Sequence, residues 1–169
     1  MPISVVNRNI IISGDFDANL ANRFFEEFLT LDQITADITI VITGSQGGDW
    51  DVAGLAMMQL ILSSENNIIS HGYGEISSSA AMVWLAADVR TLFKGSLLLF
   101  HTGNASVEDL DTKEFTKMAH ILERQNAEDY EYLSSRSNKP PSFWREKMQN
   151  DAFIFPEEAL ELELIHKII

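Results

Sequence analysis

The stretch that decides the fold of this chain is Gly74–Ala87, GEISSSAAMVWLAA, in which a small polar segment runs abruptly into an apolar helical pattern. A short apolar run, Asn67–Ser70, precedes it, and a second, Leu97–Phe100, follows it and ends at His101. Both runs have the length and composition of buried strands. We therefore expect a turn between a strand and a helix here, with a histidine at the end of the next strand that could meet one of the serines.

The segments before this stretch alternate between strand and helix patterns. They are a strand at Val5–Ile12, a helix at Ala18–Leu29 with Asp17 as its N-cap, a β-branched strand at Ile38–Ile42, and a helix at Val52–Leu62. A continuous β-branched run is typical of a strand buried in a parallel sheet. The order strand, helix, strand, glycine turn, helix predicts the α/β class.

The segments after the stretch continue the alternation and then become highly charged. They are a helix from about Ala80 to Ala87, strands at Val89–Phe93 and Ser96–Phe100, a polar loop at Asn104–Asp111, a helix from Thr112 to about Ser135, a helix at Phe143–Met148 capped by Ser142, an extended piece within Asn150–Phe155, and a final helix opening at Pro156. The helix at Thr112 to about Ser135 is too long and too polar to pack flat on a sheet along its whole length. We expect part of it to protrude and bind another subunit, and a solvated long helix is the alternative.

Length and composition restrict the class of protein. The 169 residues suit a single domain, residues 1–169, with a proper core, and no repeat or interdomain linker interrupts them. A formal net charge of −13 argues against nucleic acid or an anionic membrane surface as a partner. The absence of cysteine excludes disulfides and thiolate chemistry. No run approaches the ~20 apolar residues of a membrane span, and Met1–Ser4 does not open a signal peptide, so we expect a cytoplasmic protein.

The serine-rich turn is the first candidate for chemistry. Nucleophilic catalysis needs a hydroxyl, a base, an orienting acid and donors for the developing oxyanion. Of Ser77, Ser78 and Ser79, only Ser79 abuts the apolar helix, where the amide of Ala80 lies at the positive helix end. A capping stretch for the helix is the alternative interpretation.

Histidine and aspartate candidates lie elsewhere in the chain. His101 ends an apolar strand, and α/β folds often carry catalytic and binding residues at strand ends. The alternative is a structural histidine that is hydrogen-bonded at the end of the strand. His71 is a cramped alternative, and His120 and His166 fall in charged helical segments typical of a surface. Asp151 is either an orienting carboxylate or a turn former. No two histidines have metal-ligand spacing, so we expect no metal site and no cofactor.

The glycine turn Gly44–Gly48 follows the β-branched strand. It lacks the terminal Lys-Ser/Thr of a P-loop and does not match G-x-G-x-x-G, so nucleotide binding is disfavoured. We expect it to expose backbone amides beside the serine turn and to make room for a substrate strand.

Four stretches occur in a particular order. Ser45–Gly48 reads SQGG, Gly74–Ala87 leads from a glycine through serines into a small-residue helix, His101 ends an apolar strand, and Asp151–Ala159 reads DAFIFPEEA. In this order they resemble the Clp protease proteolytic subunit (ClpP) family, with its Ser-Pro-Gly-Gly turn, its nucleophile turn, its histidine and its Asp-x-Phe-x-x-x-Glu-Glu-Ala pattern. The resemblance covers nearly everything from about Asn9 onward and implies a ClpP/crotonase-like fold with stacked β-α units and a protruding handle helix at about 112–135.

The resemblance also implies a reaction. Aligning the small-residue helix selects Ser79 as nucleophile, with His101 as general base and then acid and Asp151 as the orienting carboxylate. The amides of Gly48 and Ala80 would form the oxyanion hole. The implied function is that of a serine endopeptidase acting on peptides or unfolded proteins inside a self-compartmentalised assembly of heptameric or double rings.

The chain also departs from the family pattern. Gln46 replaces the proline, and Asp49–Asp51 adds a residue and two acids beside the groove. The Ser79–His101 segment is shorter than usual, and the proline that commonly follows the histidine is missing. A short N-terminal segment counts against an ATP-driven AAA+ unfoldase as partner and favours a short, divergent member. The alternatives are a catalytically silent ClpP-like structural subunit and an acyl-CoA-processing enzyme of the crotonase fold.

Overall fold

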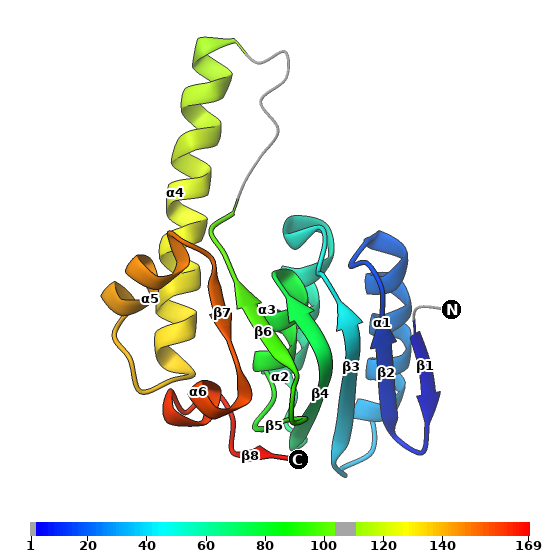
Figure 1. The fold of residues 1–169 in the computed structure, drawn as a ribbon. Helices are drawn as coiled ribbons and strands as arrows, with labels where there is room; N and C mark the ends of the chain where they lie inside the picture. The colour runs from blue at the N-terminus through cyan, green and yellow to red at the C-terminus, as the bar shows by residue number, and fades with distance from the viewer. Residues whose placement is uncertain (1–2, 104–110) are drawn as a thin grey trace. The chain divides into compact units, whose positions relative to one another are not determined.

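The computed structural model describes residues 3–103 and 111–169 (Figure 1). The chain divides into two compact units. The first unit comprises Met1–Phe100 with Phe153–Ile169, and the second comprises His101–Ala152. Of the polar loop expected at Asn104–Asp111, residues 104–110 lie outside the described part of the chain.

The first unit is built on a twisted sheet. Its described strands are β1 (Ile3–Val6), β2 (Asn9–Ser13), β3 (Ile38–Ser45), β4 (Ile68–Ser77), β5 (Val89–Leu92), β6 (Leu97–Phe100), β7 (Ala152–Ile154) and β8 (Lys167–Ile168). Strands β1 to β4 lie side by side in this order, followed by β5 and β8, while β6 pairs with β4 and β7 (Figure 1). The pairs β2–β3, β3–β4, β4–β5, β4–β6 and β5–β8 are parallel, and the pair β1–β2 is antiparallel. The predicted α/β class is confirmed.

Strand β4 organises this sheet. Its first half, Ile69–Gly72, pairs with β5, and its second half, Glu75–Ser77, pairs with β6. The expected strand at Asn67–Ser70 is therefore only the beginning of a longer one. Residues Gly74–Ser77, which we expected in a turn, are still in the strand, because pairing with β6 supplies their hydrogen-bonding partners. The turn proper begins at Ser78.

Five helical segments of the first unit follow these strands. They are α1 (Ala18–Asp32), the π-helical turn η1 (Trp50–Gly54), α2 (Leu55–Ser63), α3 (Ser79–Leu85) and α6 (Pro156–Glu161). The predicted cap of the first helix is confirmed, since the Asp17 side chain accepts a hydrogen bond from Leu20 N. All seven residues of α3 are buried, and α1 contributes Leu20, Phe24 and Phe28 to the core. This burial explains why the apolar run after the serines forms a helix inside the fold.

The expected strand Val5–Ile12 is two strands, and this prediction is wrong. Asn7 and Arg8 have φ angles of 49° and 64°, the left-handed conformation of a two-residue hairpin turn. Arg8 is held there because its guanidinium donates to the carbonyl oxygen of Leu31 in the last turn of α1 and to three carbonyl oxygens beyond the helix, those of Ile34, Ala36 and Asp37. A long-range interaction thus fixes a turn that the local pattern conceals.

The second unit contains α4 (Thr112–Ser135) and α5 (Pro141–Met148). The predicted bounds of the long helix are confirmed, and a capping box formed by Asp111 and Glu114 starts it. The two helices are in contact, and Tyr130 and Leu133 of α4 and Trp144 of α5 are buried. The expected cap residue Ser142 instead lies inside α5, because Pro140 is the N-cap and Pro141 takes the first helical position.

Much of α4 is exposed in the described structure. Only Tyr130 and Leu133 among its residues are buried, and the apolar side chains of Phe115 and Ile121 are each 51% exposed. None of the described helices is long and apolar enough to cross a membrane.

Candidate functional site

The serine turn, Ser77–Ser79, connects β4 to α3 through one strained residue, Ser78. Ser78 has φ 57° and ψ −131°, which an L-residue adopts only when its surroundings enforce it. Its amide donates to Leu99 O at 2.8 Å, and its carbonyl accepts from Ala81 N at 3.0 Å. The strand β6 on one side and the helix α3 on the other therefore hold the turn in place.

The three serines of the turn have different environments. The Ser77 hydroxyl is buried and donates to Glu75 Oε1 at 2.8 Å. Ser78 is the N-cap residue, but its side chain makes no capping hydrogen bond to α3. Ser79 is the first residue of α3, is 2% exposed, and donates to the carbonyl oxygen of Gly48 at 3.3 Å. The hydroxyl of Ser79 is thus the one directed at the glycine turn.

The glycine turn packs directly on the serine turn. Gly47 has φ +87°, and a β-carbon added there would lie 2.7 Å from Ser77 O, 2.8 Å from Ser78 Cβ and 3.0 Å from Ser79 N. Only a glycine fits this position without moving the serine turn. Ser45, which is almost fully buried, supports the glycine turn by donating to Gly14 O at 2.6 Å and accepting from Gly47 N at 3.2 Å.

Two backbone amides, those of Gly48 and Ala80, lie near Ser79. Phe16 pairs with the glycine turn through Gly47 O and Asp49 N, so the backbone groups of Gly48 itself take no part in this bridge. Among the described residues, no hydrogen bond engages the amide of Gly48 or that of Ala80. Such free amides beside a buried hydroxyl are what an oxyanion site requires.

His101 and Asp151 belong to the second unit, whereas Ser79 belongs to the first. His101 follows β6 directly, and its Nδ1 lies 2.8 Å from Thr102 O. Because a carbonyl oxygen only accepts, Nδ1 carries the proton in this contact. In the described structure, no hydrogen bond or ion pair joins Asp151 to His101, and the triad remains a prediction.

Asp151 occupies a turn immediately before β7. It is exposed and has φ 49°, a left-handed conformation that aspartate tolerates better than most residues. The turn-forming role that we considered from the sequence is therefore present.

Asn126 is a residue near this site that sequence analysis did not identify. Its Oδ1, on α4, accepts a hydrogen bond from Gly103 N at 2.8 Å and so ties the segment after His101 to the helix. The two residues are 23 positions apart, and an asparagine within a charged helix carries no local signal for such a contact.

The other histidines have structural settings. His71 lies within β4, its Nδ1 is 2.6 Å from Thr91 Oγ1, and burial lowers its pKa. His120 is a surface residue of α4, as expected. His166 is exposed but lies outside the helices, where its Nδ1 accepts a hydrogen bond from Arg90 N at 3.0 Å. Within residues 3–103 and 111–169, no cluster of carboxylates or histidines could hold a metal ion.

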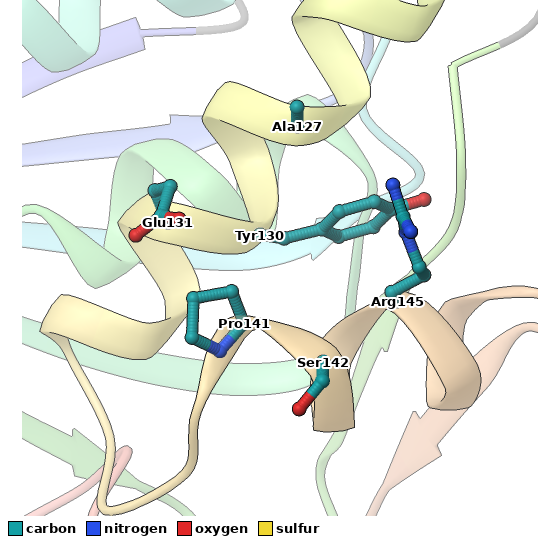
Figure 2. A pocket seen from close by; sticks show the side chains of 6 residues that line it. All are labelled: Ala127, Tyr130, Glu131, Pro141, Ser142 and Arg145. Atoms are coloured by element: carbon teal, nitrogen blue, oxygen red, sulfur yellow. The ribbon is translucent and has the colours of Figure 1, made fainter.

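The second unit has a pocket of about 230 Å³ between α4 and α5 (Figure 2). Figure 2 shows the Tyr130 ring directed from α4 toward the Arg145 side chain of α5. Burial raises the pKa of Tyr130, and the nearby Arg145 charge partly offsets this increase. The pocket contains none of the residues predicted for the site.

Comparisons with known proteins point to one family. The Clp protease family model matches residues 3–169. The ATP-dependent Clp protease proteolytic subunit 2 of Treponema denticola is 25% identical over 164 residues, covering 95% of this chain and 81% of the relative. The protein of the same name from Borreliella burgdorferi is 32% identical over 88 residues, covering 52% of this chain and 44% of the relative.

A solved structure of a ClpP1 point mutant from Listeria monocytogenes has the same fold. It superimposes with a TM-score of 0.81 at 21% identity, covering 96% of this chain and 91% of the other. The predicted resemblance and fold class are confirmed.

Proposed function

The chain belongs to the Clp protease family, and from this membership we propose that residues 1–169 act as one serine-type endopeptidase domain. Ser79 is the nucleophile, His101 the general base and Asp151 the residue that orients the imidazole. The substrates are peptides or unfolded protein segments. The family membership supports the protease activity, and the individual residues are our assignment.

The reaction follows from these roles. Ser79 Oγ attacks the carbonyl carbon of the scissile peptide bond while His101 takes its proton. The amides of Gly48 and Ala80 donate to the resulting oxyanion. His101 then gives the proton to the leaving amine, and a water molecule, activated by the same histidine, hydrolyses the acyl-enzyme.

The observation that carries the proposal is the arrangement around Ser79. Its hydroxyl is buried at the first position of α3 and donates to Gly48 O. The amides of Gly48 and Ala80 have no hydrogen-bond partner among the described residues. Gly48 is exposed and Ala80 lies in the first turn of α3, where amides have no partner within the helix, so both amides remain available as donors to an oxyanion.

A fluorophosphonate probe tests this assignment. We expect the intact protein to gain one probe mass on Ser79, and Ser79→Ala to abolish both labelling and peptide hydrolysis while leaving the circular dichroism spectrum unchanged. Ser77→Ala is the matched control and should still be labelled. Modification of Ser77 or Ser78 with Ser79 untouched would refute the assignment, and so would hydrolysis that survives Ser79→Ala.

A catalytically silent structural subunit is the second candidate. It is favoured by one observation, namely that His101 Nδ1 contacts Thr102 O and not Asp151. Peptide hydrolysis by the purified chain alone distinguishes the two functions. If the chain hydrolyses peptides only after mixing with an active family member, and Ser79→Ala changes nothing in that mixture, the silent role is correct.

Assembly into rings is part of the proposal. Helix α4 presents Phe115 and Ile121 largely to solvent, which supports its use in contacts between subunits. Native mass spectrometry should find a mass near a single or double ring, whereas a stable monomer would contradict the role of α4. Degradation of a folded substrate by this chain together with an AAA+ unfoldase and ATP tests whether such an unfoldase is a partner.

A further inference from the structure

The segment Asp49–Asp51, which adds a residue to the family pattern, coincides with an unusual backbone. Residues Trp50–Gly54 form the π-helical turn η1, in which Gly54 N donates to Asp49 O at 3.0 Å. Asp49 Oδ1 accepts from Val52 N at 3.0 Å and fixes the start of the turn. A π-helical turn is how a helix accommodates one extra residue, and such turns are frequent at functional sites.

Within this π-helical turn, the Trp50 ring lies close to Ser79. A β-carbon added to Gly54 would lie 2.5 Å from Trp50 Cε3 and 2.8 Å from Ser79 Cβ. Because both atoms lie this close to one point, the indole ring and the Ser79 side chain are near neighbours. Both residues belong to the first unit, so their proximity is a property of that unit alone.

Trp50 is only partly buried, in contrast to the fully buried Trp84 and Trp144 of the core. A partly exposed indole beside a nucleophile occupies space that a substrate would otherwise use. The side chain nearest to Ser79 in an acylation step is that of the residue whose carbonyl is attacked. A ring in this position therefore limits the size of that substrate side chain.

We propose that Trp50 is a specificity-determining residue that restricts the substrate side chain preceding the scissile bond to small residues. This inference rests on the proposed peptidase function and names the substrate class of the same site. A pocket discriminates by size with factors of about 10 to 200 for one methylene group. We accordingly expect a preference for alanine over phenylalanine of about tenfold or more.

The test uses two peptidyl diphenyl phosphonates that differ only in the residue next to phosphorus, alanine or phenylalanine. Each forms a covalent adduct with the nucleophilic serine, so the rates of Ser79 modification are measured by intact-protein mass spectrometry. In the unsubstituted protein the alanine probe should react faster by about tenfold or more, and in Trp50→Ala this ratio should fall toward one. Trp50→Phe, which keeps a smaller ring, should give an intermediate ratio.

Val52→Ala is the matched control, because Val52 lies on the same π-helical turn with its side chain 53% exposed. Its ratio should equal that of the unsubstituted protein. An equal loss of both rates in Trp50→Ala and Trp50→Phe would show that the ring is merely structural, and an unchanged ratio in both would also overturn the inference. Absence of Ser79 modification in the unsubstituted protein would instead refute the peptidase function itself.

Discussion

Replacing Gly47 by alanine should damage the nucleophile turn in a way that can be measured. The backbone at Gly47 has φ +87°, and the new β-carbon would lie 2.7 Å from Ser77 O and 3.0 Å from Ser79 N. The left-handed backbone costs about 1 kcal/mol for an L-residue. The close contacts with a packed backbone add about 1–3 kcal/mol. The expected loss in the free energy of unfolding is therefore about 2–4 kcal/mol.

Gly95→Ala is the matched control for this substitution. Gly95 has φ +82°, almost the same backbone conformation, but an added β-carbon would meet nothing within 4 Å. Only the conformational cost applies, about 1 kcal/mol. For a chain of this size 1 kcal/mol corresponds to about 2–4 °C in Tm. Gly47→Ala should accordingly lower Tm by about 4–16 °C, and Gly95→Ala by about 2–4 °C.

The two variants should also differ in reactivity. Gly47→Ala displaces the amide of Ser79 and with it the hydroxyl, and a misplacement of about 1 Å costs about a hundredfold in rate. Fluorophosphonate labelling should therefore slow at least tenfold in Gly47→Ala, by the same reasoning on misplacement, and remain unchanged in Gly95→Ala. Equal effects of the two variants on both Tm and labelling would refute the argument that the glycine turn positions the serine.

Three further predictions concern residues away from this contact. Arg8→Ala should lower the free energy of unfolding by about 1–2 kcal/mol, measured as a lower Tm, because four carbonyl oxygens lose their donor. Arg8→Lys should recover little of this stability, since an ammonium group lacks the planar, forked set of donors of a guanidinium. Because burial lowers the pKa of His71 below its ordinary value of 6.5, the unfolded chain takes up a proton first as the pH falls. The contribution of His71 to the free energy of unfolding should be fully present above pH 6.5 and should decline as the pH falls below this value. In urea unfolding at a series of pH values, His71→Gln should reduce the dependence of the free energy of unfolding on pH, and an unchanged dependence would contradict the role given to His71. Asparagine also tolerates φ 49°, so Asp151→Asn should leave Tm unchanged. The rate of peptide hydrolysis should nevertheless fall on the order of a hundredfold or more. An unaltered rate would show that Asp151 acts only as a turn residue.

The elements that the sequence predicted well are those whose ends depend on local interactions. Helix α4 begins where Asp111 and Glu114 form a capping box and keeps its predicted bounds of Thr112–Ser135. Helix α1 likewise begins after Asp17, whose side chain accepts from Leu20 N. Both signals lie within a few residues of the helix they start, so no knowledge of the rest of the fold was needed.

The elements that were mispredicted depend on distant partners. Strand β4 continues to Ser77 because β6 pairs with its second half, and the two strands are separated by the whole of α3. The hairpin at Asn7 and Arg8 is held by carbonyl oxygens of a segment more than twenty positions away. Strand β8 is two residues long and exists through pairing with β5. A one-dimensional pattern does not contain these pairings.

In the candidate site, too, the sequence predicted the residues but not their long-range contacts. The motif order selected Ser79, and the structure supplies what the motif could not, namely the hydroxyl contact with Gly48 O and the tight packing of Gly47 on the serine turn. The resemblance predicted an added residue at Asp49–Asp51, but it did not predict the backbone there, since a π-helical turn and a displaced loop would both accommodate one residue. In the structure Trp50–Gly54 form a π-helical turn, and Gly54 and the Trp50 ring both lie close to Ser79. If Ser79 is the nucleophile, as we propose, a tryptophan ring beside it changes which substrates fit without removing the hydroxyl that reacts, so we expect altered substrate selection and not loss of the reaction.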